Sequence, residues 1–125
     1  LEDYARVCIP LYNARAPVDP DQSARAILNA DVMRHFAIAP GEVRTMDFRA
    51  RLKVARCPVL VVGGLDDPAT PPACSEEIAA HLPAHLTELR LFAGCGHGVH
   101  RDNPERFWPL LREWIARVCA GPQPA

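Results

Sequence analysis

The amino-acid sequence predicts an α/β fold with a small parallel sheet in its C-terminal half and helices before it. Two short β-prone runs, CPVLVVGG at 57–64 and LTELRLF at 86–92, are separated by a helix-like segment. A long amphipathic segment follows the second run. Strands that alternate with helices pair in parallel through right-handed crossovers. No strand-like run occurs before residue 50, so helices are expected there.

Two segments of the N-terminal part have helical character. Apolar residues in LEDYARVCIPLYN, residues 1–13, recur at helical intervals. The segment PVDPDQSARAILNADVMRHFAI, residues 17–38, opens with Asp and Pro, which favour helix starts, and is long enough for one or two helices. Pro40 and Gly41 break the pattern after it.

The C-terminal half is predicted to run strand, helix, strand, helix. The continuous run 59–62 is typical of a strand that is buried on both faces. Prolines open the helix-like segment 71–82, and Asn103 and Pro104 are the expected N-cap and first residue of the last helix. Pro109 removes one backbone donor, so a kink or a preceding short turn is expected. The apolar stripe of this helix is Phe107, Leu110, Leu111, Trp114, Ile115 and Val118.

Composition and charge exclude several classes of function. With 14 basic and 15 acidic residues in 125, the chain has no basic stripe, so neither nucleic-acid nor membrane-surface binding is expected. No apolar run reaches the roughly 18 residues of a membrane span, and no signal-peptide pattern follows Leu1. Five scattered cysteines without a CxxC pair fit a reducing compartment, so we expect a cytoplasmic protein without metal or cofactor.

Acidic residues and a histidine follow the two predicted strands. Asp66 and Asp67 come after the first strand, and His97 comes after the second, within AGCGHGVH. Because reactive side chains collect at the carboxyl ends of parallel strands, an Asp and the His can meet there. An Asp that accepts the Nδ1–H of a His fixes its tautomer and lets it take a proton from a nucleophile. Taken singly, each is more often a turn or surface residue.

CPVLVVGGLDDPATPP and AGCGHGVHRDNPERFWPLLREWI together resemble the C-terminal end of the α/β-hydrolase fold. Asp67 lies in the family's Gly-x-x-Asp-x-x-x-Pro loop and His97 in its Gly-x-Gly-His loop. The resemblance covers residues 47–120. It implies that Asp67, rather than Asp66, is the acid of a catalytic triad and that His97 is its base.

The first part of the chain resembles the end of the helical cap of this fold. CIPLYN, NADVMRHF and FRARLKVARCPVLVV are similar to the proline iminopeptidase-like branch, which implies an aminopeptidase acting on small peptides. By this resemblance, residues 1–46 end the cap and residues 47–125 form the C-terminal part of the core. In such peptidases acidic cap residues hold the free amine of the substrate. The candidates, each of which is alternatively a solvated surface charge, are Glu2, Asp3, Asp19, Asp21 and Asp31.

The nucleophile of a serine hydrolase is not found in these 125 residues. Ser23 and Ser75 both lie in helix-like segments without the Gly-x-Ser-x-Gly turn. The family's order of Ser, acid and His places the nucleophile before Leu1. We therefore expect an incomplete fold, the last two strands and helices of the sheet, that is inactive alone. Its β-prone edge would need the missing N-terminal part of the core, or self-association.

The residues leave several alternatives open. An esterase, a lactonase, a haloperoxidase-like hydrolase or a carbon–carbon bond hydrolase would use the same residues on another substrate. A non-catalytic remnant would act as a binding or assembly module. Cys95 is a possible nucleophile beside His97. A metal site of His97, His100 and Asp102 has suitable ligand types but lacks the helical spacing of known motifs.

Overall fold

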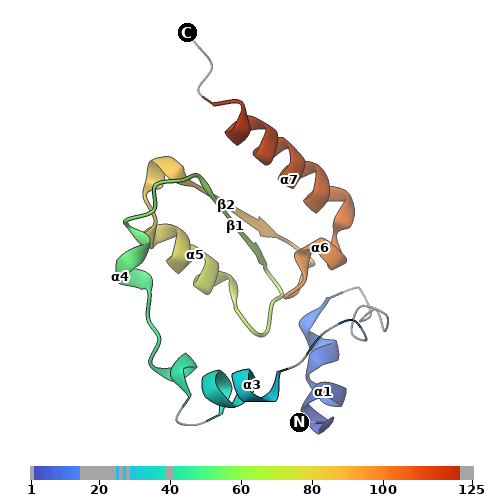
Figure 1. Ribbon diagram of the computed structural model, residues 1–125. Coiled ribbons are helices and arrows are strands. Elements are labelled where there is room, and N and C mark those ends of the chain that lie inside the picture. Colours follow the sequence, from blue (N-terminus) through green and yellow to red (C-terminus); the bar gives the residue numbers. More distant parts are fainter. Residues whose placement is uncertain (1, 15–24, 26, 28, 39–40, 122–125) are drawn as a thin grey trace.

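The structure is a computed structural model that describes residues 2–14, 25, 27, 29–38 and 41–121. The helices before the first strand are α1 (Glu2–Val7), η1 (Ile9–Tyr12), α3 (Ala30–Ala37), η2 (Glu42–Arg44) and α4 (Arg49–Leu52). The elements that follow are β1 (Val59–Gly64), α5 (Pro72–His81), η3 (Ala84–Leu86), β2 (Thr87–Phe92), α6 (Val99–Asp102) and α7 (Pro104–Cys119), as Figure 1 shows.

The strands β1 and β2 form a parallel pair joined by α5. The register runs from Val59 opposite Thr87 to Gly64 opposite Phe92, so the predicted strands, their direction and the helical crossover are all confirmed. The expected burial of β1 on both faces is met only in part, because Val61 is buried while its neighbours are half-buried. The part of the chain that the structure describes supplies no third strand to pair with the outer edge of β1.

The helices α5 and α7 lie on opposite sides of the strand pair (Figure 1). Successive strand residues point to opposite faces, and β1 uses this alternation. Gly63 faces α5, where an added Cβ would come within 2.5 Å of Ser75 Oγ. Val62 instead packs against the core on the α7 side. That core consists of buried Phe92, Cys95 and Val99 and half-buried Phe107 and Leu110.

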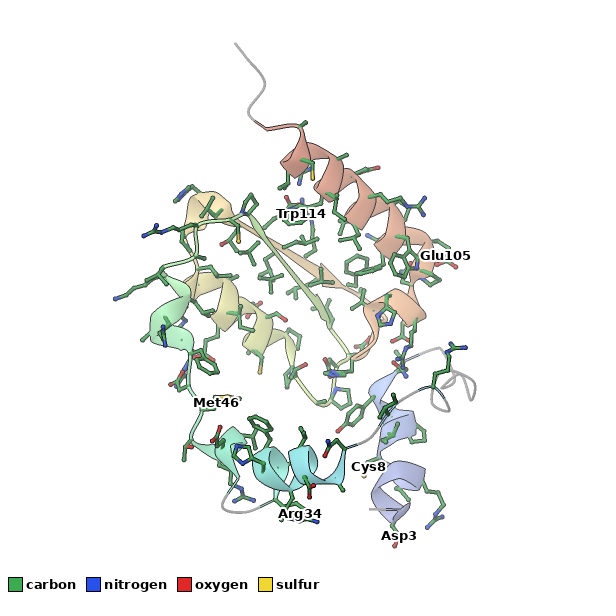
Figure 2. All side chains as sticks on the ribbon, viewed as in Figure 1. Asp3, Cys8, Arg34, Met46, Glu105 and Trp114 are labelled. Atoms are coloured by element: carbon green, nitrogen blue, oxygen red, sulfur yellow. The ribbon has the colours of Figure 1, made fainter. Side chains whose placement is uncertain are left out.

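The last helix, α7, follows the short helix α6. Asn103 precedes α7 as predicted, but its side chain makes no capping hydrogen bond, so the predicted cap contact is absent. Pro109 is accommodated inside the helix, where it removes the bond that its N–H would make to the carbonyl of Glu105. The alternative of a short turn that ends at Pro109 is wrong, because α7 runs without a break from Pro104 to Cys119. Side chains of α7, Trp114 among them, extend toward the strand pair (Figure 2).

The N-terminal segment α1–η1 lies beside α6, near the carboxyl ends of the strands (Figure 1). The helix predicted over 1–13 is partly correct: α1 ends at Val7 and the chain continues as a 3₁₀ turn over Ile9–Tyr12. The helix α3 begins after Asn29, whose side chain accepts hydrogen bonds from the backbone N–H groups of residues 31 and 32. Most of the remaining segment predicted to be helical, 17–28, lies outside the described residues.

One exposed ion-pair network connects the segment before β1 to α5. The guanidinium of Arg49 lies 2.6 Å from Asp47 Oδ2 and 2.7 Å from Glu77 Oε1. Such exposed pairs contribute little stability each. None of the helices in the described ranges has both the length and the apolar character needed to cross a membrane.

Candidate active site

The loop after β1 wraps around a buried carboxylate. Asp67 is only 7% exposed, and its Oδ1 accepts hydrogen bonds from the backbone N–H groups of Ala69 (2.8 Å) and Thr70 (3.0 Å). Its Oδ2 accepts the Thr70 hydroxyl at 2.7 Å. Because these donors lie two and three residues further along, the loop sequence itself fixes the orientation of the carboxylate.

The remaining position on that carboxylate is occupied by the histidine of the second loop. His97 Nδ1 lies 2.9 Å from Asp67 Oδ2, so the predicted contact between Asp67 and His97 is present. Asp66 is exposed, and its backbone N–H donates to the carbonyl of Cys95 (2.9 Å). The contact therefore involves the second aspartate of the pair, as the Gly-x-x-Asp spacing predicts.

The charge state of Asp67 follows from its partners. Burial raises the pKa of this carboxyl. The backbone N–H and hydroxyl of Thr70, together with His97 and the Ala69 N–H, outweigh burial and lower the pKa from 3.8 to about 2. Asp67 is therefore an anion at neutral pH. An anion next to Nδ1 favours the imidazole tautomer with its proton on Nδ1.

The loop after β2 approaches the end of β1 closely. Leu65 N–H donates to the carbonyl of Phe92 at 3.0 Å, which extends the contact between the strands. A Cβ at Gly64 would lie 2.2 Å from the carbonyl oxygens of both Cys95 and Gly96. Glycine at this position therefore lets the two loops meet, which brings Asp67 and His97 into hydrogen-bond distance.

A second buried carboxylate holds the histidine loop. Asp102, on α6, is 5% exposed, and its Oδ2 accepts the N–H groups of Gly96 (2.7 Å) and Ala14 (2.9 Å). The backbone N–H of His97 donates to the carbonyl of Tyr12 at 2.5 Å. The Tyr12 ring meets the imidazole edge-on, with 5.5 Å between centroids. The N-terminal segment thus contacts the histidine loop directly.

A cavity of about 440 Å³ adjoins the exposed side of this pair. The His97 side chain is 47% exposed, so its ring is accessible while Nδ1 is engaged. The size falls within the range of small-molecule sites. The lining residues are Ile9, Tyr12, Asn13, His97, Gly98, His100 and Arg101. A larger hollow of about 680 Å³ lies elsewhere, between residues 44–52 and α5, away from both loops.

The alternative chemistries of the histidine loop do not match its geometry. Cys95 is fully buried in the core, with Sγ directed to the carbonyl of Ala93 (3.8 Å), so it is not placed to attack a substrate. The metal site of His97, His100 and Asp102 does not form, because Asp102 Oδ2 binds two backbone N–H groups. Within the described ranges, no group of three or more His, Cys, Asp or Glu residues is arranged to hold a metal ion.

Of the acidic residues proposed to bind a substrate amine, the two whose side chains the structure describes form ion pairs with arginines. Asp3 pairs with Arg6 (3.1 Å) and Asp31 with Arg34 (2.7 Å), both on exposed helix surfaces. Asp19, Asp21 and the side chain of Glu2 lie outside the described part. Ser23 does as well, and Ser75 lies on α5 against Gly63.

Sequence reasoning missed the roles of three residues around the site, although it had considered Asp102 as a metal ligand. Thr70 contacts both members of the pair, Asp102 holds the histidine loop and the Tyr12 ring meets the imidazole edge-on. The loop carried a usable signal only for its backbone contacts, since a loop aspartate commonly accepts a hydrogen bond from the N–H two residues further on, here that of Ala69. The partners of Asp102 are backbone N–H groups 6 and 88 positions away, and no local pattern points to them.

The chain is similar to parts of longer proteins. It is 33% identical over 76 residues to RutD of Pantoea ananatis and 29% identical over 105 residues to RutD of Escherichia coli; both are named as candidate carbamate hydrolases. These regions cover 61% and 84% of this chain but only 27% and 38% of those proteins. No family model matches the chain.

A solved structure shows the same architecture. It is a thermophilic esterase from Thermogutta terrifontis, with a TM-score of 0.57 and 30% identity over 66% of this chain and 29% of that one. The chain thus spans well under half the length of the proteins it matches. The parallel strand pair, the flanking helices and these similarities identify the chain as having the fold of the C-terminal portion of an α/β-hydrolase.

Proposed function

We propose that the chain is the C-terminal part of a serine hydrolase that cleaves esters or carbamates, with Asp67 as the triad acid and His97 as its base. The observation that carries this proposal is the 2.9 Å contact between Asp67 Oδ2 and His97 Nδ1, on a ring that is 47% exposed beside a cavity. The nucleophilic serine lies outside these 125 residues, in the part that the longer relatives possess.

The proposed chemistry follows from the protonation of the pair. Asp67 keeps the proton on Nδ1, so Nε2 carries a lone pair and accepts the serine proton as the serine oxygen attacks the carbonyl carbon. The imidazolium returns that proton to the departing alcohol or amine, and an acyl- or carbamoyl-serine remains. Water then repeats the sequence and releases the acid. Donors for the developing oxyanion come from the same external part as the serine.

The ester and carbamate class is favoured over the aminopeptidase class for two reasons. The proteins to which the chain is similar are named as candidate carbamate hydrolases and as an esterase. The described lining of the cavity contains no carboxylate residue; it carries Arg101, His97 and His100 instead. A site for a free substrate amine needs a negative partner.

We also assign residues 1–46 to the end of a cap and 47–125 to the catalytic core.

The test uses a longer protein that carries this chain together with its Gly-x-Ser-x-Gly segment. It is assayed with nitrophenyl acetate, a nitrophenyl N-alkylcarbamate and proline nitroanilide, with the His97→Gln variant as the control for background hydrolysis. We expect turnover of the ester, the carbamate or both, lost in the variant. Turnover confined to the prolyl amide would restore the peptidase assignment, and equal rates for wild type and His97→Gln would contradict the proposed base.

A further inference from the structure

The hydroxyl of Thr70 lies between the two members of the proposed acid–base pair. Thr70 Oγ1 is 2.7 Å from Asp67 Oδ2 and 3.2 Å from His97 Nδ1. The Oδ2 and Nδ1 atoms are themselves 2.9 Å apart. The three polar atoms therefore form a closed triangle. Each of its three sides needs one donor and one acceptor.

The protons in this triangle can be assigned by counting donors and acceptors. An ionised carboxylate only accepts, whereas a hydroxyl has one proton and two lone pairs. The Thr70 proton therefore points to the charged Oδ2 at the shorter distance, and a hydroxyl lone pair is left facing Nδ1. Nδ1 then faces two acceptors, Oδ2 and Oγ1, so it carries the proton.

The opposite tautomer would break this arrangement. With Nδ1 unprotonated, its lone pair would face the carboxylate, and the Thr70 hydroxyl would have to leave Oδ2 to donate to the ring. That exchange gives up a hydrogen bond to a charged group, which is worth more than a neutral one. Thr70 thereby adds to the preference that Asp67 alone imposes.

The same residue also holds the other carboxylate oxygen. The backbone N–H of Thr70 donates to Asp67 Oδ1 at 3.0 Å. Thr70 thus donates a hydrogen bond to each oxygen of the acid, one from its backbone and one from its side chain. One acceptor direction of Oδ2 is left for the imidazole. Rotation of the carboxylate away from His97 would break both contacts.

We propose that Thr70 is a positioning residue for the pair: its hydroxyl fixes the orientation of the Asp67 carboxylate and keeps the proton of His97 on Nδ1. Only the catalytic consequence rests on the proposed function. The hydrogen-bond arrangement is independent of it and can be measured without any substrate.

Thr70→Val removes the hydroxyl at nearly constant shape and keeps the backbone N–H. In the longer protein that carries this chain, nitrogen-15 NMR of the His97 ring reports the tautomer, and proton exchange reports protection of Nδ1–H. We expect exchange about tenfold faster in Thr70→Val, with kcat about tenfold lower and KM little changed. Thr70→Ser, which restores the hydroxyl, should return both values to within about twofold.

Thr87→Val is the matched control, because its hydroxyl bonds the carbonyl of Pro83 at 2.9 Å and touches neither Asp67 nor His97. Thr70→Ala provides a second variant without the hydroxyl, should the added methyl of valine disturb the loop. Wild-type ring-nitrogen shifts and exchange in Thr70→Val would overturn the proposal. So would a Thr70→Ser protein as impaired as Thr70→Val. If wild type turned over no substrate, the proposed function would fail, while the NMR comparison would still decide the role of Thr70.

Discussion

The loops after β1 and β2 are held in opposite ways. The acid loop is organised locally: three of the hydrogen bonds to Asp67 come from residues 69 and 70. The histidine loop is tied to the N-terminal segment: the N–H of His97 donates to the carbonyl of Tyr12, 85 residues before it, and Asp102 accepts the N–H groups of both Gly96 and Ala14. The acid is therefore preorganised by its own segment, whereas the base is positioned by the docking of the N-terminal segment.

This difference separates two kinds of perturbation. Changes in the acid loop should act on the chemistry and leave the rest of the fold in place. Changes around the histidine loop should act on position and stability together, because a single carboxylate, Asp102, accepts N–H groups from both Gly96 and Ala14.

The largest effect is expected from Asp67→Asn. The amide cannot hold the imidazole in the required tautomer, so kcat of a protein containing the complete triad should fall by about 10³–10⁴-fold. The adjacent Asp66→Asn is the matched control and should change kcat less than about threefold, since Asp66 is exposed and lies outside the triangle. A larger loss in Asp66→Asn than in Asp67→Asn would reverse the assignment of the acid.

Gly96→Ala should have the next largest effect. An added Cβ would lie 2.2 Å from the Tyr12 carbonyl oxygen, so the loop must move relative to the N-terminal segment. A displacement of about 1 Å costs about 10²-fold in rate. Gly98→Ala is the graded comparison, because its Cβ would meet the movable Asn13 Oδ1 at 2.4 Å. Steady-state kinetics should give a much lower kcat for Gly96→Ala than for Gly98→Ala. Equal kcat values would show that the Tyr12 contact does not position the base.

Asp102→Asn should lower the stability of the fold more than it affects the chemistry. Both N–H groups bond Oδ2, so an amide oxygen at that position keeps both contacts only as weaker, uncharged hydrogen bonds, and the NH₂ group replaces Oδ1 in a buried place. We expect a loss of about 1–3 kcal/mol in unfolding free energy, measured by denaturant titration. Asp31→Asn, on the exposed surface of α3, is the control. A loss no greater than that of Asp31→Asn would mean that Asp102 does not anchor the loop.

An effect of similar size is expected in the response of Asp67 to pH. Its folded pKa of about 2 lies below its ordinary value of 3.8, so its contribution to stability is complete above about pH 4 and is lost as pH falls through 2. The stability difference between wild type and Asp67→Asn should be constant from about pH 8 to 4 and then shrink by about 2 kcal/mol toward pH 2. A difference that already shrinks between pH 7 and 5 would contradict a strongly stabilised anion.

The same contrast explains what could be predicted from the sequence. The strands, the crossover helix and the meeting of an aspartate with His97 follow from local patterns, because strand direction brings the two loop ends together. The choice of Asp67 over Asp66 came from the family resemblance. The roles of Asp102 and Tyr12 could not be predicted. The N–H of Ala14 lies 88 residues from Asp102, and His97 lies 85 residues after Tyr12, while the contact of Asp102 with Gly96, six residues before it, follows no local pattern. The predicted cap contact of Asn103 is wrong: Asn103 precedes α7, but its side chain makes no hydrogen bond to the first turn of that helix. The prolyl substrate was inferred from diffuse cap similarity, without a residue that selects it.

The most direct test of the account is to locate the nucleophile. A fluorophosphonate probe is applied to the longer protein that carries this chain, and the modified residue is mapped by mass spectrometry in wild type, His97→Gln and Asp66→Asn. The account predicts labelling of one serine within a Gly-x-Ser-x-Gly turn outside these 125 residues, strongly slowed in His97→Gln and unchanged in Asp66→Asn. Labelling of Ser23, Ser75 or Cys95, or a rate that does not depend on His97, would contradict it.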